Sequence, residues 1–78
     1  MDHFDQALKF IQAGRLDEAR IYLEELLKQN SKDIDLLYNL GMLYTDLGKP
    51  MKAIPLLQKC IEISPRHANA HVALGFAY

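Results

Sequence analysis

Apolar side chains recur along the chain at intervals of three and four residues, which is the period of a helix with one buried face. One such stretch carries Phe4, Ala7, Leu8 and Ile11, and the next carries Ala19, Tyr22, Leu23, Leu26 and Leu27. The same spacing continues to the end of the sequence. We therefore predict five amphipathic helices, with expected bounds of 3–13, 17–29, 34–47, 50–63 and 68–78.

Residues that start, end or interrupt helices support these bounds. Asp2 and Asp33 are the expected N-caps of the first and third helices, because short acidic side chains accept hydrogen bonds from free backbone N–H groups. Gly14 and Gly48 should end the first and third helices, since glycine adopts the left-handed conformation without strain. Pro55 lies inside the fourth helix, where we expect a slight bend on the outer side and no break.

One short motif occurs twice in the chain, thirty-four residues apart. It reads Leu-x-x-Leu-Gly-x-x-Tyr from Leu37 to Tyr44 and His-x-x-Leu-Gly-x-x-Tyr from His71 to Tyr78. The Gly, Ala and Leu at positions 14, 19 and 23 recur at positions 48, 53 and 57 in the same way. With Pro65 closing the middle unit, this order resembles the tetratricopeptide repeat, whose helix–turn–helix unit has this length and signature.

The resemblance extends over the whole chain, but unevenly. Residues 34–67 form a complete unit, residues 1–33 a degenerate one, and residues 68–78 the first helix of a third. The resemblance implies an all-α, right-handed superhelical stack of antiparallel helix pairs, an α-solenoid. Because such units bury their faces on one another and about three are usually needed, we expect a single domain that is an N-terminal fragment of a longer protein.

Small residues mark the places where these helices should approach one another closely. They are Ala7, Gly41 and Gly75 in the first helices, and Ala19, Ala53 and Cys60 in the second helices. Cys60 is therefore expected to be a small buried apolar residue. The predicted core is Ala7, Phe10, Leu23, Leu26, Leu40, Leu43, Tyr44, Ala53, Leu57 and Cys60.

Composition excludes several classes of function. Half of the residues are apolar and 24% are charged, with a net charge of −1, so no basic surface favours nucleic acid or an anionic membrane. No apolar run has the length of a membrane span, and no signal peptide is evident. The single cysteine cannot form an internal disulfide, which suits a cytoplasmic protein.

Catalytic and metal-binding patterns are missing as well, so we expect no enzyme activity, cofactor or metal. No glycine-rich phosphate loop and no nucleophile motif occurs. His67 and His71 are one helical turn apart, but no third ligand lies near them in the sequence. The acidic pairs Asp17-Glu18 and Glu24-Glu25 are read as solvated helix residues that pair with nearby basic side chains.

The resemblance also implies where a ligand would bind, because in this family the first helix of each unit lines the concave side. An apolar stripe is then expected there, made of Phe4, Leu8, Tyr38, Met42, Val72 and Phe76. Its polar flank would be Asp5, Gln12, Asp35, Asn39, Asp46 and Asn69. Such a groove suits an amphipathic helix or extended peptide with apolar anchors and some basic residues. The alternative is that the stripe is packing between helices.

One binding mode of the family does not fit this sequence. Some members hold the C-terminal carboxylate of a chaperone peptide with lysine, arginine and asparagine side chains. Here the matching positions carry Phe4, Leu8, Asn39, Asn69 and Ala73, which leaves a single matching asparagine and no cation to pair with a carboxylate.

The leading hypothesis is a non-catalytic scaffold that binds a protein or peptide. Two alternatives stay open: the recognition arm of a larger enzyme with its catalytic domain beyond Tyr78, and a secretion-type chaperone. The fifth helix has no second helix of its own unit to pack on. We therefore expect self-association through Leu74, Gly75 and Tyr78.

Overall fold

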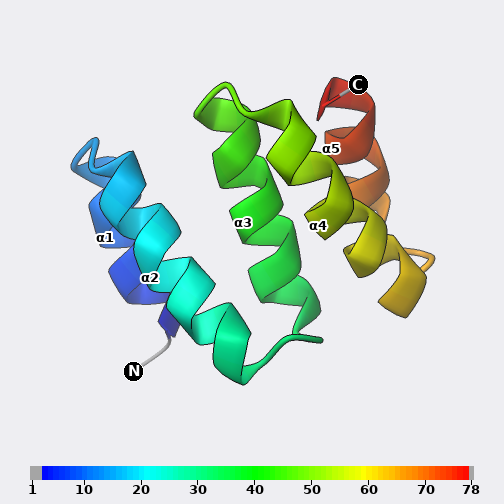
Figure 1. Ribbon diagram of the computed structural model, residues 1–78, viewed down its shortest axis with the longest axis horizontal. Helices are drawn as coiled ribbons and strands as arrows, with labels where there is room; N and C mark the ends of the chain where they lie inside the picture. Colours follow the sequence, from blue (N-terminus) through cyan, green and yellow to red (C-terminus); the bar gives the residue numbers. More distant parts are fainter. Residues whose placement is uncertain (1–2, 78) are drawn as a thin grey trace.

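The computed structural model describes the backbone of residues 3–77 and the side chains of residues 5–75. Within that part of the chain all regular structure is helical and consecutive helices run antiparallel (Figure 1). The helices are α1 (His3–Gln12), α2 (Leu16–Gln29), α3 (Ile34–Asp46), α4 (Pro50–Ile63) and α5 (Ala68–Ala77). The predicted α-solenoid is confirmed, and each observed helix end lies within one residue of its predicted position.

Two glycines make the sharp turns inside the helix pairs. Gly14 and Gly48 have φ values of +77° and +74°, in the left-handed region that favours glycine. After Gly14, the N–H of Arg15 donates to the carbonyl oxygen of Phe10 at 2.8 Å, and the equivalent bond after Gly48 is also 2.8 Å long. These bonds, each reaching back five residues, satisfy a free carbonyl at the helix end.

Two further backbone features agree with the sequence analysis. The Asp33 carboxylate caps α3 by accepting hydrogen bonds from the N–H groups of Asp35 at 3.0 Å and Leu36 at 3.3 Å. Pro55 is exposed, and α4 continues through it from Pro50 to Ile63. The predicted cap at Asp2 lies outside the described residues.

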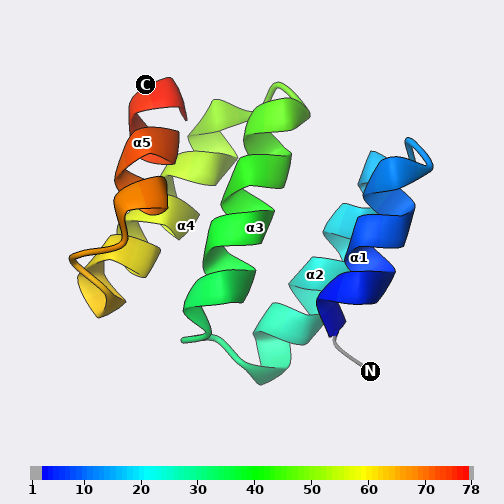
Figure 2. The same ribbon diagram turned by 180° about the vertical axis from the view of Figure 1, so that it is seen from behind.

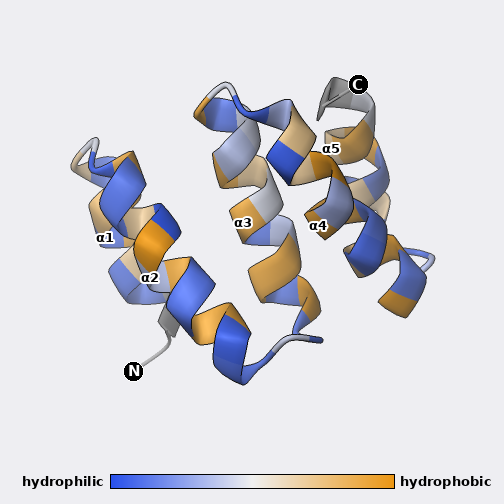
Figure 3. Cartoon of the chain, viewed as in Figure 1, coloured by the Kyte–Doolittle hydropathy of each residue, from blue (hydrophilic) through white to orange (hydrophobic). Residues whose placement is uncertain are grey.

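The core lies along α3, where it packs on α2 and α4. Buried residues in the described part of the chain match the prediction at Ala7, Leu23, Leu40, Leu43, Tyr44, Ala53, Leu57 and Cys60. Hydrophobic residues recur along α2, α3 and α4 (Figure 3). The prediction is wrong for Phe10 and Leu26, which are half-buried. The Phe10 ring instead makes an edge contact with Tyr22, with ring centroids 6.2 Å apart, and this contact joins α1 to α2.

Gly41 allows the closest approach between helices of the middle unit. A Cβ atom at this position would lie 2.8 Å from the side chain of Leu57 and 3.6 Å from the carbonyl oxygen of Ala53. The predicted close contact is therefore confirmed between α3 and α4. At Gly75 nothing lies within 4 Å of an added Cβ, which agrees with the expectation that α5 has no second helix of its own unit to pack on.

The stack is not packed evenly. α3 packs most extensively on α4, and α5 packs on both α3 and α4. The pair α1–α2 joins the rest through α2 and α3, and no comparable contact between α1 and α3 or between α2 and α4 exists among the described residues. Figure 2 shows α1, α3 and α5 on one side of the molecule, whereas α2 and α4 lie in front in Figure 1.

Candidate protein-interaction surfaces

Helix α3 separates two faces of the molecule. Successive residues of an α-helix are rotated by about 100°, so Asn39 and Met42 point away from the side that carries Leu40 and Tyr44. Burial follows this division, because Leu40 and Tyr44 are buried, whereas Asn39 is exposed and Met42 is half-buried. We call the side of α1, α3 and α5 the first-helix face and the side of α2 and α4 the second-helix face.

The residues predicted for the groove differ in their exposure on the first-helix face. The Leu8 side chain is 50% exposed and Val72 is 60% exposed, while Tyr38 and Met42 are half-buried. The described polar flank is exposed at Asp5, Gln12, Asp35, Asn39, Asp46 and Asn69. The side chains of Phe4 and Phe76 lie outside the described residues.

A small hollow brings two of the predicted groove residues together. It has a volume of about 180 Å³ and is lined by Ala7, Leu8, Ile11, Leu23 and Asn39. Leu8 comes from α1 and Asn39 from α3, so the hollow spans the junction between the first two units. The Asn39 amide donates to the carbonyl oxygen of Asp35 at 2.7 Å. Tyr38, the residue before Asn39 on α3, lies against the ring of His67 at a centroid distance of 5.1 Å.

A larger cleft lies on the second-helix face, between α2 and α4. Its volume is about 560 Å³, and α3 forms its floor. Its lining residues are Glu24, Leu27, Lys28, Leu40, Tyr44, Met51, Lys52, Pro55 and Leu56. This cleft was not predicted from the sequence. Its depth depends on the distance between α2 and α4. The only feature of the sequence that points to the cleft is a pair of lysines, at positions 28 and 52, beside apolar residues.

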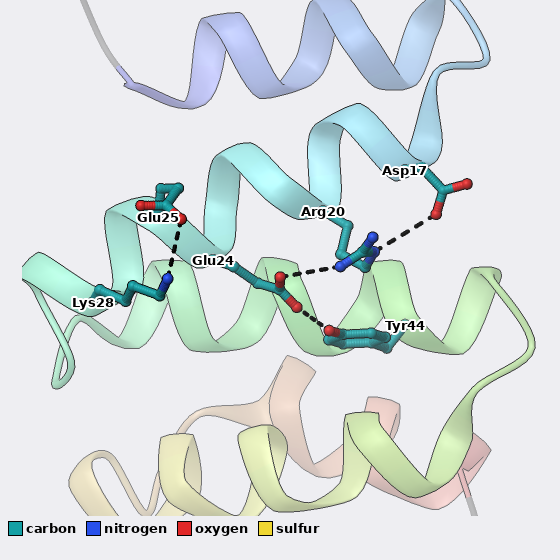
Figure 4. Close-up of polar contacts among 6 residues, drawn as sticks. All are labelled: Asp17, Arg20, Glu24, Glu25, Lys28 and Tyr44. Atoms are coloured by element: carbon teal, nitrogen blue, oxygen red, sulfur yellow. Dashed lines mark hydrogen bonds and ion pairs between the residues drawn. The ribbon is translucent and has the colours of Figure 1, made fainter.

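A chain of polar contacts connects α2 with α3 at the edge of this cleft (Figure 4). The Tyr44 hydroxyl donates to a Glu24 carboxylate oxygen, and the other Glu24 oxygen lies 3.1 Å from Nη1 of Arg20. Arg20 Nε also lies 3.6 Å from Asp17. The predicted pairing of the acidic residues with basic neighbours is confirmed for Glu24 with Arg20 and for Glu25 with Lys28. The predicted solvated outer face is wrong for Glu24, because its carboxylate is half-buried between two helices.

The environment of Tyr44 favours the neutral hydroxyl. Burial of the ring and the hydrogen bond to Glu24 both raise the pKa of Tyr44 above its ordinary value of 10.0. The neighbouring Arg20 opposes this shift, since a positive charge stabilises a phenolate. The nearby Tyr44 hydroxyl, and to a lesser extent the carboxylates of Glu24 and Asp17, raise the pKa of Arg20. Tyr44 is therefore a hydrogen-bond donor at neutral pH.

Cys60 has the environment of a structural cysteine. Its side chain is fully buried, and its sulfur lies 3.6 Å from the carbonyl oxygen of Ile34. Burial, and to a lesser extent the charge of Asp35, raise the pKa of the Cys60 thiol. Because the thiolate is the reactive form, burial and the raised pKa both disfavour reaction at this sulfur, and the expected small buried residue is observed.

Both described histidines make local hydrogen bonds. Nδ1 of His67 accepts from the N–H of Ala70 at 3.0 Å and so caps α5. Nε2 of His71 donates to the carbonyl oxygen of Pro65 at 2.8 Å. No group of three or more His, Cys, Asp or Glu side chains is placed to hold a metal ion in the described part of the chain. No helix there combines the length and apolar character that a membrane crossing requires.

Comparison with known proteins agrees with this geometry. Residues 34–67 match the family model of the tetratricopeptide repeat. This stretch is a tetratricopeptide repeat, so the resemblance inferred from the sequence is confirmed. The division of the remaining residues into a degenerate first unit and a partial third unit stays a prediction.

Several longer proteins contain a similar stretch. The whole chain is 30% identical over 79 residues to a peroxisomal targeting signal receptor of Pichia angusta, of which it covers 14%. It is 28% identical over 75 residues to a PEX5-related protein of Mus musculus, with 96% of the chain and 13% of that protein aligned. A CTR9 homolog of Arabidopsis thaliana is 34% identical over 65 residues, which are 83% of the chain and 6% of that protein.

The chain thus spans 14% or less of the length of these relatives. The relatives carry different names, and what they share with the chain is a stretch of about two repeat lengths. Their similarity therefore supports the repeat architecture.

Proposed function

We propose that this chain is a non-catalytic protein-interaction module, a scaffold that binds a peptide or partner helix in a concave groove on the first-helix face. The observation that carries the proposal is the exposure of Leu8 and Val72, at 50% and 60%, on a face rimmed by carboxylates and amides. Exposed apolar side chains with a polar rim are typical of an interaction surface.

The chemistry of the groove selects the kind of partner. Tyr38 and Met42 are half-buried on α3, where each keeps part of its surface for a ligand. The thioether of Met42 adapts to irregular shapes, and a tyrosine is a frequent anchor in protein interfaces. Asp35 and Asp46 are exposed beside them, so a ligand with apolar anchors and basic residues fits best.

The relatives support this proposal in general terms. One of them is named a peroxisomal targeting signal receptor. A chain with the same repeat is well suited to recognising a segment of another protein. The proposal includes a cytoplasmic setting and no dependence on a cofactor, metal, nucleic acid or membrane.

The groove is tested with the variants Tyr38→Ala and Met42→Glu. Nuclear magnetic resonance titration with a synthetic leucine- and lysine-containing amphipathic peptide should show binding that each variant weakens about tenfold, in line with loss of a central anchor. Helicity and melting temperature should stay nearly unchanged. The matched control is Met51→Glu, which adds the same charge on the second-helix face.

Two results would contradict the groove. If Tyr38→Ala and Met42→Glu unfold the chain, the apolar stripe is packing between helices. If Met51→Glu weakens binding of the peptide as much as Met42→Glu does, the loss is not specific to the first-helix face, and that face has no special role.

We also propose that the chain associates with itself through α5. This helix contains no charged residue, and its described residues pack on α3 and α4 from one side. Next to Leu74 there is a hollow of about 440 Å³, which Gln58, Ile61, Glu62 and His71 also line. A helix without charged residues beside such a hollow suits end-to-end packing of two copies or exchange of the helix.

Sedimentation at micromolar concentration tests this association. We expect an oligomer that Leu74→Lys disperses and that Val72→Lys leaves intact, because Val72 points to the other side of α5. A strictly monomeric chain with an ordered α5 would contradict the proposal.

A further inference from the structure

We propose that the cleft between α2 and α4 is a second interaction surface, which binds an acidic amphipathic helix of a protein partner. The inference concerns the second-helix face and does not depend on the groove of the first-helix face. It starts from the volume of the cleft, about 560 Å³, which is in the range of sites that hold ligands.

The cleft exists because α2 and α4 are held apart. Each of the two helices packs on α3, but the described residues make no backbone contact between α2 and α4. Leu40 and Tyr44 of α3 form the floor, so the depth of the cleft is set by buried side chains of the core. Figure 1 shows α3 between the two outer helices. The arrangement gives a trough with helical walls on both sides.

The walls present apolar surface to solvent. Met51 is 80% exposed at the edge of the cleft, and Leu27 and Leu56 are half-buried on opposite walls. Pro55 lies beside Leu56 and has no backbone N–H to satisfy. An apolar side chain entering the trough would cover all four residues. Met51 is suited to this role, because an unbranched thioether adapts to the shape of its partner.

The charges that remain available at the cleft are positive. The Glu24 carboxylate is occupied by Tyr44 and Arg20. Lys52 has its ammonium 5.7 Å from the centroid of the Tyr44 ring and makes no ion pair within the described residues. Lys28 pairs with Glu25 at 3.1 Å, but both side chains are more than 60% exposed, and such a surface pair is readily exchanged for another. Both lysines can therefore pair with carboxylates of a ligand.

The start of α4 strengthens this preference. A helix N-terminus carries partial positive charge and is normally accompanied by acidic residues. Helix α2 follows this rule with Asp17 and Glu18, whereas the first turn of α4 has no acidic residue and contains Lys52, preceded by Lys49. This end of α4 lacks the negative charge that would stabilise it. A glutamate or aspartate of the partner would supply that charge.

The opposite face of α3 carries charge of the opposite sign. Asp5, Asp35 and Asp46 are exposed on the first-helix face, whereas the exposed charges that line the cleft are Lys28 and Lys52, beside the half-buried Glu24. The chain has a net charge of only −1. The difference in charge between the two faces therefore does not result from an excess of one sign of charge in the whole chain. A basic ligand is excluded from the cleft and an acidic one from the groove, which would allow one chain to hold two partners at once.

The probe is a synthetic helical peptide with leucines at three- and four-residue spacing and glutamates on either side of them. Titrated into the ¹⁵N-labelled chain, it should shift the amide signals of Leu27, Lys28, Met51 and Lys52. The variant Lys52→Glu should weaken binding about tenfold, because a rim charge that attracts the peptide would then repel it. Raising the salt concentration should weaken binding of the wild type as well.

Two control variants show whether the effect is confined to the cleft. Lys9→Glu makes the same charge change at an exposed lysine of α1, away from the cleft, and should leave the affinity nearly unchanged. Met42→Glu alters the first-helix face and should also leave this titration unchanged. Failure of the groove and failure of the cleft are thus distinguished by different variants and by peptides of opposite charge.

Four outcomes would overturn the proposal. These are no amide shifts at millimolar peptide, equal binding of a peptide with lysine in place of glutamate, shifts centred on Leu8 and Asn39, or equal loss of affinity in Lys9→Glu. Sedimentation of the chain without peptide gives a further test. A dimer that Lys52→Glu dissociates would overturn it as well, because a second copy of the chain would then occupy the cleft.

Discussion

Tyr44 stabilises the fold in two ways, through its buried ring and through its hydroxyl. The ring is part of the core between α2, α3 and α4, and the hydroxyl donates to Glu24 twenty residues earlier in the sequence. Hydrogen bonds to charged groups contribute more than neutral ones, and an acceptor left without its donor loses that contribution. The single hydroxyl therefore affects the contact between two helices as well as local packing.

We expect Tyr44→Phe to lower the free energy of unfolding by about 1 to 3 kcal/mol, the range for a hydrogen bond to a charged group. The phenyl ring keeps the packing, so the change isolates the hydroxyl. Urea denaturation followed by circular dichroism measures the difference. Tyr22→Phe is the matched control, because Tyr22 touches Phe10 through its ring. An equal loss in both variants would contradict a special role for the Tyr44 hydroxyl.

The same residue predicts how stability depends on pH. Burial and Glu24 raise the pKa of Tyr44 above 10.0 in the folded state. A raised pKa in the folded state means that the stabilisation is complete below the ordinary pKa and is lost as pH rises through the folded value. As pH rises from about 9 through the ordinary tyrosine pKa and beyond, the wild type should lose more stability than Tyr44→Phe. Parallel profiles in denaturation experiments would contradict this expectation.

At the scale of helices, glycine has different roles at equivalent positions of the repeat. Gly41 faces α4, and an added Cβ would lie 2.8 Å from the Leu57 side chain, which is itself fully buried. Gly75 occupies the corresponding place in α5, but nothing lies within 4 Å of an added Cβ there. The position of a glycine in the repeat therefore does not by itself determine whether the glycine is needed for packing. That depends on whether a neighbouring helix lies against it.

We therefore expect opposite effects of two alanine substitutions. Gly41→Ala should lower the free energy of unfolding by about 1 to 3 kcal/mol, because Leu57 must move within a packed core. Gly75→Ala should raise it by about 0.5 to 1 kcal/mol, since alanine favours the helix and meets open space. Thermal and urea denaturation of both variants provide the comparison. A stabilising Gly41→Ala would show that α3 and α4 can separate at little cost.

The sequence predicted those features that depend on neighbours close along the chain. Helix ends followed from Gly14, Gly48 and Asp33, whose hydrogen bonds reach a few residues away. Burial of Phe10 was overestimated, because it depends on how tightly the first unit packs on its neighbour. The role of Glu24 was missed because its partner lies on the next helix. The cleft between α2 and α4 was missed for a related reason, since it results from the distance between two helices that make no backbone contact among the described residues.

At the scale of the whole molecule, the pair α1–α2 is less extensively packed on the pair α3–α4 than α5 is. α5 packs on both helices of the middle unit, whereas α1–α2 meets that unit through α2 and α3 alone among the described residues. The Glu24–Tyr44 hydrogen bond crosses this junction. In a repeat protein, stability is approximately the sum of the terms for each unit and for each interface. The first unit should therefore separate or unfold before the middle one.

Hydrogen exchange measures this order directly. Amides of α1 and α2 should exchange faster than those in the centres of α3 and α4, because local opening of the first unit breaks only one interface. Tyr44→Phe should increase exchange mainly in α1 and α2, since it weakens the contact that holds them to α3. Gly75→Ala, at the other end of the stack, should leave α1 and α2 unchanged. Equal protection across all four helices, or a uniform effect of Tyr44→Phe, would mean that the chain opens as one cooperative unit and that the junction is not its weakest point.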